Sequence, residues 1–132
     1  MSNSRRLQDT IQSAICKHLP PLRKTRERNV ARFCAALYQA EHVHLSKIAD
    51  HCPGRAQQTS KTRRLRRFLS NEAVDPDAWY RPVATSLIEA AAKAGPVRLL
   101  LDTVHLTGDR RLLVAALAFR RRALPVLWQV DR

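Results

Sequence analysis

The pattern of apolar residues changes at Gly95-Pro96, and this change constrains the fold more than any other feature of the chain. Before it, apolar residues recur at the spacing of amphipathic helices. After it, short runs are apolar at both alternate positions, which is typical of strands. The 132 residues are 45% hydrophobic, enough to build a core. We therefore expect an α+β chain with a helical domain over 1–95 and strands over 96–132.

Prolines and glycines divide the helical part into short segments. A first apolar stripe ends at Pro20-Pro21, and a second, longer one runs from Val30 to Tyr38. A third, short segment is expected to begin with Ser46 as its N-cap and to stop at Pro53-Gly54. The first half is thus predicted to be a bundle of short helices.

A basic segment follows, for which Thr59 or Ser60 is the expected N-cap. Leu65, Phe68 and Leu69 are expected to point into the core. A short helix, a tight turn and a second helix over 46–70 resemble a helix-turn-helix, in which the second helix lies in the major groove of DNA.

A connecting helix is predicted over 76–94. Asp75 is its expected N-cap, and Pro76 suits the first helical position because its missing N–H would be unbonded there. Pro82 lies inside the segment and is expected to kink it. The segment is nearly neutral, which suits packing better than binding to DNA.

Three strands are predicted beyond the connecting helix, over 97–103, 111–119 and 123–130. The first is apolar without alternation, which favours a central strand buried on both faces, with Asp102 at its mouth. Pro125 cannot donate to a sheet ladder, so it predicts an edge or a bulge in the third strand.

Positive charge is concentrated in the first half of the chain. Residues 1–68 contain 15 Lys+Arg and 4 Asp+Glu, whereas residues 69–132 contain 9 and 7. The densest stretch has no acid and comprises Arg55, Lys61, Arg63, Arg64, Arg66 and Arg67. Unbalanced cations repel one another unless a polyanion neutralises them, so we expect these six residues to bind nucleic acid. A solvated surface is the alternative.

The order of motifs along residues 30–130 resembles the DDE transposases of bacterial insertion sequences, which have an RNase H-like catalytic domain. The motifs are Arg67-Phe68-Leu69-Ser70-Asn71, the strand ending at Asp102, and Arg122-Ala123-Leu124-Pro125 with Trp128. The resemblance implies a helical domain that binds double-stranded transposon ends, followed by the first three strands of the catalytic domain. The turn at Arg120-Arg121-Arg122 departs from the family's glycine and predicts a looser hairpin.

The resemblance also implies that Asp102 is the first of three carboxylates that hold Mg²⁺ for phosphoryl transfer. Asp109 and Asp131 are poor substitutes for the other two, so the expectation is a truncated or fragmentary transposase that binds DNA without cleaving or joining it. Whether the chain is an enzyme stays open. From spacing alone, Asp102 could instead cap the next turn or pair with Arg110 or Arg111.

Two other functions stay open: a stand-alone helix-turn-helix DNA-binding regulator, and a basic RNA-binding protein, which the scarcity of aromatic residues disfavours. A homodimer is one option for the assembly. The longest apolar run, Leu112–Phe119, is too short to span a bilayer, and no secretory signal follows Arg5-Arg6. We therefore expect a cytoplasmic protein that associates with the bacterial nucleoid when DNA-bound.

Overall fold

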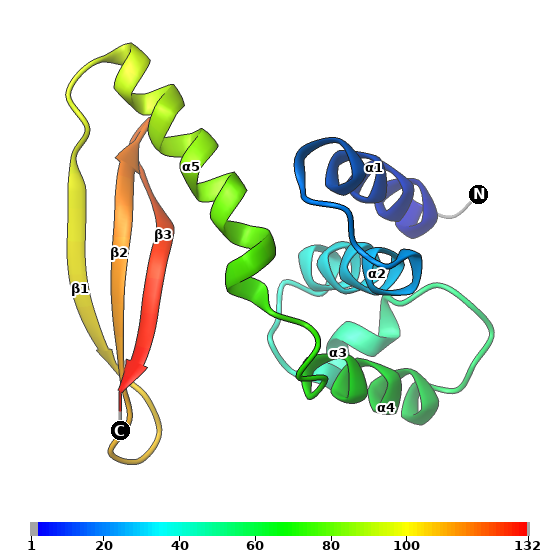
Figure 1. The fold of residues 1–132 in the computed structure, drawn as a ribbon. Coiled ribbons are helices and arrows are strands. Elements are labelled where there is room, and N and C mark those ends of the chain that lie inside the picture. Colours follow the sequence, from blue (N-terminus) through cyan, green and yellow to red (C-terminus); the bar gives the residue numbers. More distant parts are fainter. Residues whose placement is uncertain (1–2, 132) are drawn as a thin grey trace. The chain divides into compact units, whose positions relative to one another are not determined.

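The computed structural model describes residues 3–131 and confirms an α+β fold (Figure 1). In this part of the chain, five helices precede three strands: α1 (Asn3–His18), α2 (Lys24–Ala40), α3 (Leu45–Asp50), α4 (Gln58–Leu69), α5 (Pro76–Ala94), β1 (Leu99–His105), β2 (Arg111–Phe119) and β3 (Arg122–Asp131). The chain divides into two compact units, Met1–Pro76 and Asp77–Arg132.

The division between the units falls between Pro76 and Asp77, after the first residue of α5, which differs from the boundary at residue 95 that the sequence suggested. The Tyr80 hydroxyl donates a hydrogen bond to the carbonyl oxygen of Pro125 at 2.5 Å. The Tyr80 and Trp128 rings lie 5.2 Å apart between centroids. These contacts join the first turns of α5 to β3, so the predicted connecting helix is part of the sheet unit.

The core of the helical unit lies where α2, α3 and α4 meet. Phe33 and Leu37 of α2 pack against a cluster of small or branched buried residues. The buried residues are Ala36, Ile48, Ala49, Cys52 and Leu65. The apolar stripe predicted around Phe33 therefore faces this core. Helix α1 packs against α2, where Gln12 donates a hydrogen bond to Glu27 at 3.1 Å.

The ends of α3 and α4 differ from their predicted caps. Helix α3 begins at Leu45 with His44 as its N-cap, and α4 begins at Gln58 with Gln57 as its N-cap. None of the Ser and Thr side chains predicted to cap these helices does so, because each lies inside its helix. Leu65 and Phe68 are buried as expected, but Leu69 is 52% exposed because it lies at the edge of the inward face.

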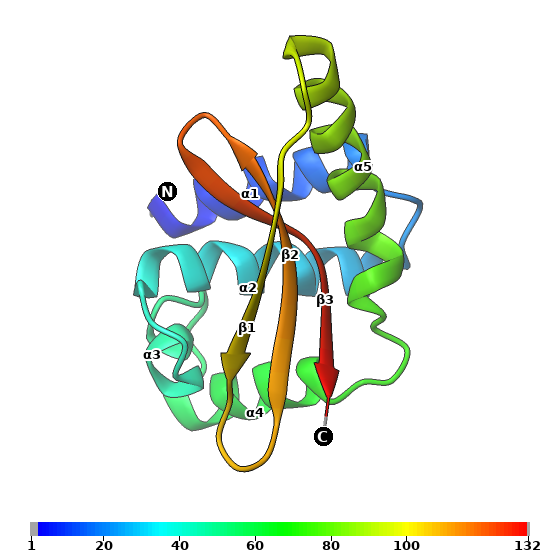
Figure 2. The ribbon, with the colours of Figure 1, turned by 90° about the vertical axis from the view of Figure 1, so that its left-hand side faces the viewer.

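The sheet is antiparallel with the order β1-β2-β3, and Figure 2 shows β2 between the two outer strands. Asp102 pairs with Val114, which pairs in turn with Trp128. The β2–β3 register shifts between Ala115 and Ala116, where Ala116 faces Pro125. The predicted location of Pro125 at an edge or bulge is confirmed, since β3 is an edge strand and is irregular at this point.

Strand β1 is the opposite edge of the sheet, and all seven of its residues are exposed. The prediction of a central strand buried on both faces was therefore wrong. In the described residues β1 has a strand neighbour on one side only. The buried residues of the sheet lie on β2, at Ala116 and Leu117.

The turn between β2 and β3 is tight, in contrast to the looser hairpin that we expected. Phe119 pairs with Arg122, so only Arg120 and Arg121 connect the strands. Both adopt left-handed backbone conformations, with φ of 48° and 62°. Two-residue hairpin turns of type I′ require positive φ at both central residues, which explains how two arginines close this turn.

Among the residues that the structure describes, no helix is both long enough and apolar enough to cross a membrane.

Candidate nucleic-acid interface

Helix α4 presents the basic segment because its apolar residues fix its orientation. Leu65 and Phe68 are buried, and the Phe68 ring lies 6.0 Å from that of Phe33 on α2. The polar residues of α4 cannot share this inward side, since positions separated by three or four residues lie on one face of a helix. The remaining faces of α4 therefore display its arginines.

Five of the six predicted DNA-binding residues are exposed. Arg63, Arg64, Arg66 and Arg67 lie on the exposed faces of α4, and Arg55 lies in the turn before it. Lys61 differs, because it is half-buried and its ammonium donates a hydrogen bond to the carbonyl oxygen of Cys52 at 2.7 Å. Lys61 of α4 is thus bonded to the turn that follows α3 and is less available to a ligand.

Gln58, the first residue of α4, also holds the connection between α3 and α4 in place. The Gln58 amide donates to the Asp50 carboxylate at 2.6 Å and to the carbonyl oxygen of Ser46 at 3.2 Å. Gln58 and Lys61 together fix α4 relative to α3, so the exposed arginines project from a held helix rather than from a mobile segment.

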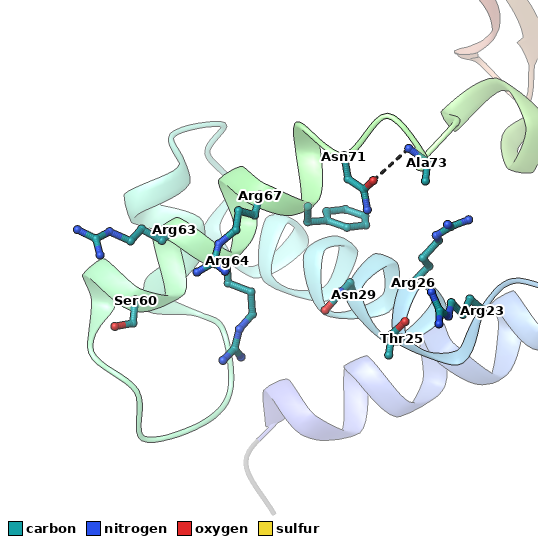
Figure 3. Close-up of a pocket in the computed structure, with 11 residues that line it drawn as sticks. Arg23, Thr25, Arg26, Asn29, Ser60, Arg63, Arg64, Arg67, Asn71 and Ala73 are labelled. Carbon is teal, nitrogen blue, oxygen red and sulfur yellow. Dashed lines mark hydrogen bonds between the residues drawn. The ribbon is translucent and has the colours of Figure 1, made fainter.

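A groove separates α4 from the start of α2, and arginines line both of its sides (Figure 3). Arg23 and Arg26 come from α2 and the residue before it, and Arg63, Arg64 and Arg67 come from α4. Neutral polar side chains lie between them: Thr25, Asn29, Ser60 and Asn71. The groove has a volume of about 700 Å³.

Arg23 and Arg26 were not predicted as members of this surface. They precede α4 by more than thirty residues, and no spacing along the chain pairs them with it. The packing of Phe33 on Phe68 brings the two helices together. The apolar stripe of α2 was the only signal in the sequence: it shows which side of α2 faces the core, but not which helix packs against that side.

No acidic residue lines the groove within the described part of the chain. Glu27 lies in the first turn of α2, but its carboxylate accepts hydrogen bonds from Gln12 and from the Cys16 thiol of α1. These bonds lower the pKa of Glu27, Cys16 contributing more than Gln12. The carboxylate is therefore ionised and committed to α1.

Arg32 extends the basic character of this region inward. Its Nε atom is buried and has no hydrogen-bond partner in the described residues. Burial lowers the pKa of Arg32, and the positive charge of Arg64 lowers it further. Like charges are thus held close together here at an electrostatic cost, which a bound anion would relieve.

Asp102, predicted at the mouth of a buried strand, lies in the middle of β1 and is exposed. Its Oδ1 accepts a hydrogen bond from the backbone N–H of Thr103 at 2.8 Å. In the described residues, no three His, Cys, Asp or Glu side chains are close enough to hold a metal ion. The neighbours of Asp102 across the sheet, Val114 and Trp128, offer no oxygen ligands, so the residues present do not fit a magnesium site.

Comparison with protein-family models, with curated proteins and with solved structures finds no match to this chain.

Proposed function

We propose that the helical unit binds double-stranded DNA through the exposed side of α4. The observation that carries this proposal is the display of four arginines, Arg63, Arg64, Arg66 and Arg67, on a helix whose apolar side is buried. Arginine side chains contact phosphate oxygens and the edges of guanine, and a helix of this kind fits the major groove.

Other polyanionic partners suit this surface less well. An amphipathic helix that binds a membrane surface needs an apolar face to insert, whereas Leu65 and Phe68 are buried within the unit. Proteins that bind single-stranded nucleic acid stack bases on aromatic side chains. The residues that line the groove and the exposed side of α4 include only one aromatic residue, Phe68, and it is buried.

The resemblance to insertion-sequence transposases extends the proposal to a specific duplex, the ends of a transposable element. Three consecutive antiparallel strands after a helical region support it, since this is the order in which the family's RNase H-like domain begins. In this proposal Asp102 is the position of the first catalytic carboxylate. We propose no cleavage or strand transfer for residues 1–132, because the surroundings of Asp102 do not fit a metal site.

Titration of a fluorescent duplex of random sequence at several salt concentrations tests DNA binding directly. If about six phosphates are neutralised, the logarithm of the association constant falls with the logarithm of salt concentration at a slope of about −5. Replacement of Arg63, Arg64, Arg66 and Arg67 by Ala should abolish binding and leave the far-ultraviolet circular dichroism unchanged. A wild-type slope near zero refutes the proposal.

A duplex that carries the inverted repeats flanking the gene then tests the narrower assignment. An element-specific binder should prefer this duplex to a scrambled one of equal length. Equal affinity for both would leave general DNA binding and contradict recognition of transposon ends.

A further inference from the structure

We propose that the groove between the start of α2 and α4 holds one strand of the DNA backbone, with Arg23 and Arg26 forming the side opposite α4. This inference rests on the proposed DNA binding and adds a second contact surface, outside the basic segment. It assigns a phosphodiester-binding role to residues that the sequence did not single out.

The two sides of the groove have matched chemistry. On α4, Ser60, Arg64 and Arg67 follow one another at helical spacing along the groove, and Asn71 lies just beyond the end of the helix. Arg26 lies in the first turn of α2 and Arg23 is its N-cap residue, and Figure 3 shows both on the opposite side of the groove from Arg64. A linear anion between these sides would meet guanidinium groups from both helices.

The charges of the groove are not neutralised by the protein. None of its five arginines takes part in a salt bridge with a described Asp or Glu; the ion pair found, Arg81–Asp77, lies in the other unit. Glu27, which follows Arg26, is bonded to α1 through Gln12 and Cys16, and Glu72, between Asn71 and Ala73, does not line the groove. Five guanidinium groups without counter-charges around one hollow favour a ligand with several negative charges along its length.

The neutral residues of the groove suit phosphate oxygens. Asn71 accepts a hydrogen bond from the backbone N–H of Ala73 at 3.0 Å through its Oδ1, so its amide nitrogen remains able to donate. Thr25, Asn29 and Ser60 add three further side chains that can donate. Backbone phosphates are commonly bound by this mixture of Arg, Ser, Thr and Asn, together with the positive end of a helix such as α2.

A free phosphate or nucleotide has the same chemistry as one unit of the backbone. The extended arrangement favours the polymer, because arginines lie along both sides of the groove rather than converging from one loop. The experiment below separates the two sources.

The test compares R23Q/R26Q with the control R5Q/R6Q in the full chain. Both variants lose two positive charges, but Arg5 and Arg6 lie near the N-terminal end of α1, where Ser4 contacts Gln39 at the opposite end of α2. Each lost phosphate contact changes the salt slope by about 0.9. R23Q/R26Q should therefore weaken the slope by about 2 on every duplex sequence, and R5Q/R6Q should leave it within about 0.5 of wild type.

The outcomes are distinguishable from failure of DNA binding itself. A wild-type chain that does not bind duplex refutes the proposed function and this inference together. A wild-type chain that binds with the full slope, while R23Q/R26Q has the same slope, refutes only the groove. If inorganic phosphate binds the wild-type chain, R23Q/R26Q abolishes that phosphate binding, and the same variant keeps the wild-type salt slope on duplex, the ligand is free phosphate and the backbone assignment is overturned.

A measurement on the wild-type protein avoids dependence on the variants' folding. Phenylglyoxal modifies accessible arginines, and mass spectrometry locates the modified sites. Bound duplex should protect Arg23 and Arg26, while Arg5 and Arg6 continue to react. Equal reaction of all four with and without DNA contradicts the inference.

Discussion

A comparison of Lys61 with Arg66 tests whether a cation of α4 stabilises the fold or binds DNA. The Lys61 ammonium donates to the carbonyl oxygen of Cys52, whereas Arg66, further along α4, is exposed and outside the groove. Lys61→Met and Arg66→Met each remove one positive charge and retain an unbranched apolar stem. Lys61→Met should therefore reduce stability and leave DNA binding unchanged, whereas Arg66→Met should weaken DNA binding and change stability little.

The expected loss of stability for Lys61→Met follows from the environment of the bond. A hydrogen bond from a charged donor contributes about 1.5–3 kcal/mol, and the lower end applies here because Lys61 is only half-buried. For a unit of this size, 1 kcal/mol shifts the melting temperature by about 4–8 °C. Lys61→Met should lower the melting temperature of the helical unit by roughly 6–12 °C, and Arg66→Met should change it little.

DNA titrations well below the melting temperature complete the comparison. Arg66→Met should weaken the salt slope by about 0.9, the value for one phosphate, and Lys61→Met should leave the slope unchanged. Circular dichroism at 222 nm gives the melting temperature, and fluorescence anisotropy gives the slope. The reasoning is refuted if Lys61→Met weakens the slope as much as Arg66→Met does without lowering the melting temperature.

Three further predictions concern the sheet unit. Arg121→Gly should raise hydrogen-exchange protection in β3. Glycine relieves about 1–2 kcal/mol of left-handed backbone strain, which exceeds its entropic cost of about 0.5–1 kcal/mol. Lower protection in the variant would contradict this prediction. Tyr80→Phe should reduce protection in β3 by about 1 kcal/mol through loss of the bond to Pro125, and unchanged protection would show that the ring contact with Trp128 suffices. Burial raises the pKa of Tyr80, so the unfolded state loses the phenol proton first as pH rises above about 10. The wild type should therefore lose stability in this pH range, and Tyr80→Phe should lose less. Denaturant titrations at several pH values measure the difference.

Local signals predicted much of the secondary structure. The bounds of α5 follow from Pro76 at one end and Gly95 at the other, and Pro125 indicated the irregularity of β3. These features depend on backbone geometry within a few residues, which the residue types themselves restrict. The buried positions Leu65 and Phe68 were predictable for the same reason, since a helical stripe needs only one helix to define it.

Features that depend on contacts between distant segments were not predictable. The apolar run of β1 has the composition of a buried strand, but burial depends on neighbours that its own residues do not specify. The role of Lys61 depends on the carbonyl oxygen of Cys52, nine residues away across a turn. The arginines of α2 join the interface only through the packing of Phe33 against Phe68.

The structure assigns a different set of cations to the proposed DNA-binding surface than the sequence did, and this difference decides which experiments can identify the surface. The sequence indicated six DNA-binding cations, including Lys61. The structure removes Lys61 from the exposed set and adds Arg23 and Arg26, so seven cations are available. At about 0.9 per phosphate, the slopes expected for the two sets differ by a single contact, and a slope counts neutralised phosphates without showing which residues neutralise them. The wild-type slope therefore tests whether this unit binds DNA, but only the paired substitutions of Lys61 with Arg66, and of Arg23 and Arg26 with Arg5 and Arg6, test which surface does so.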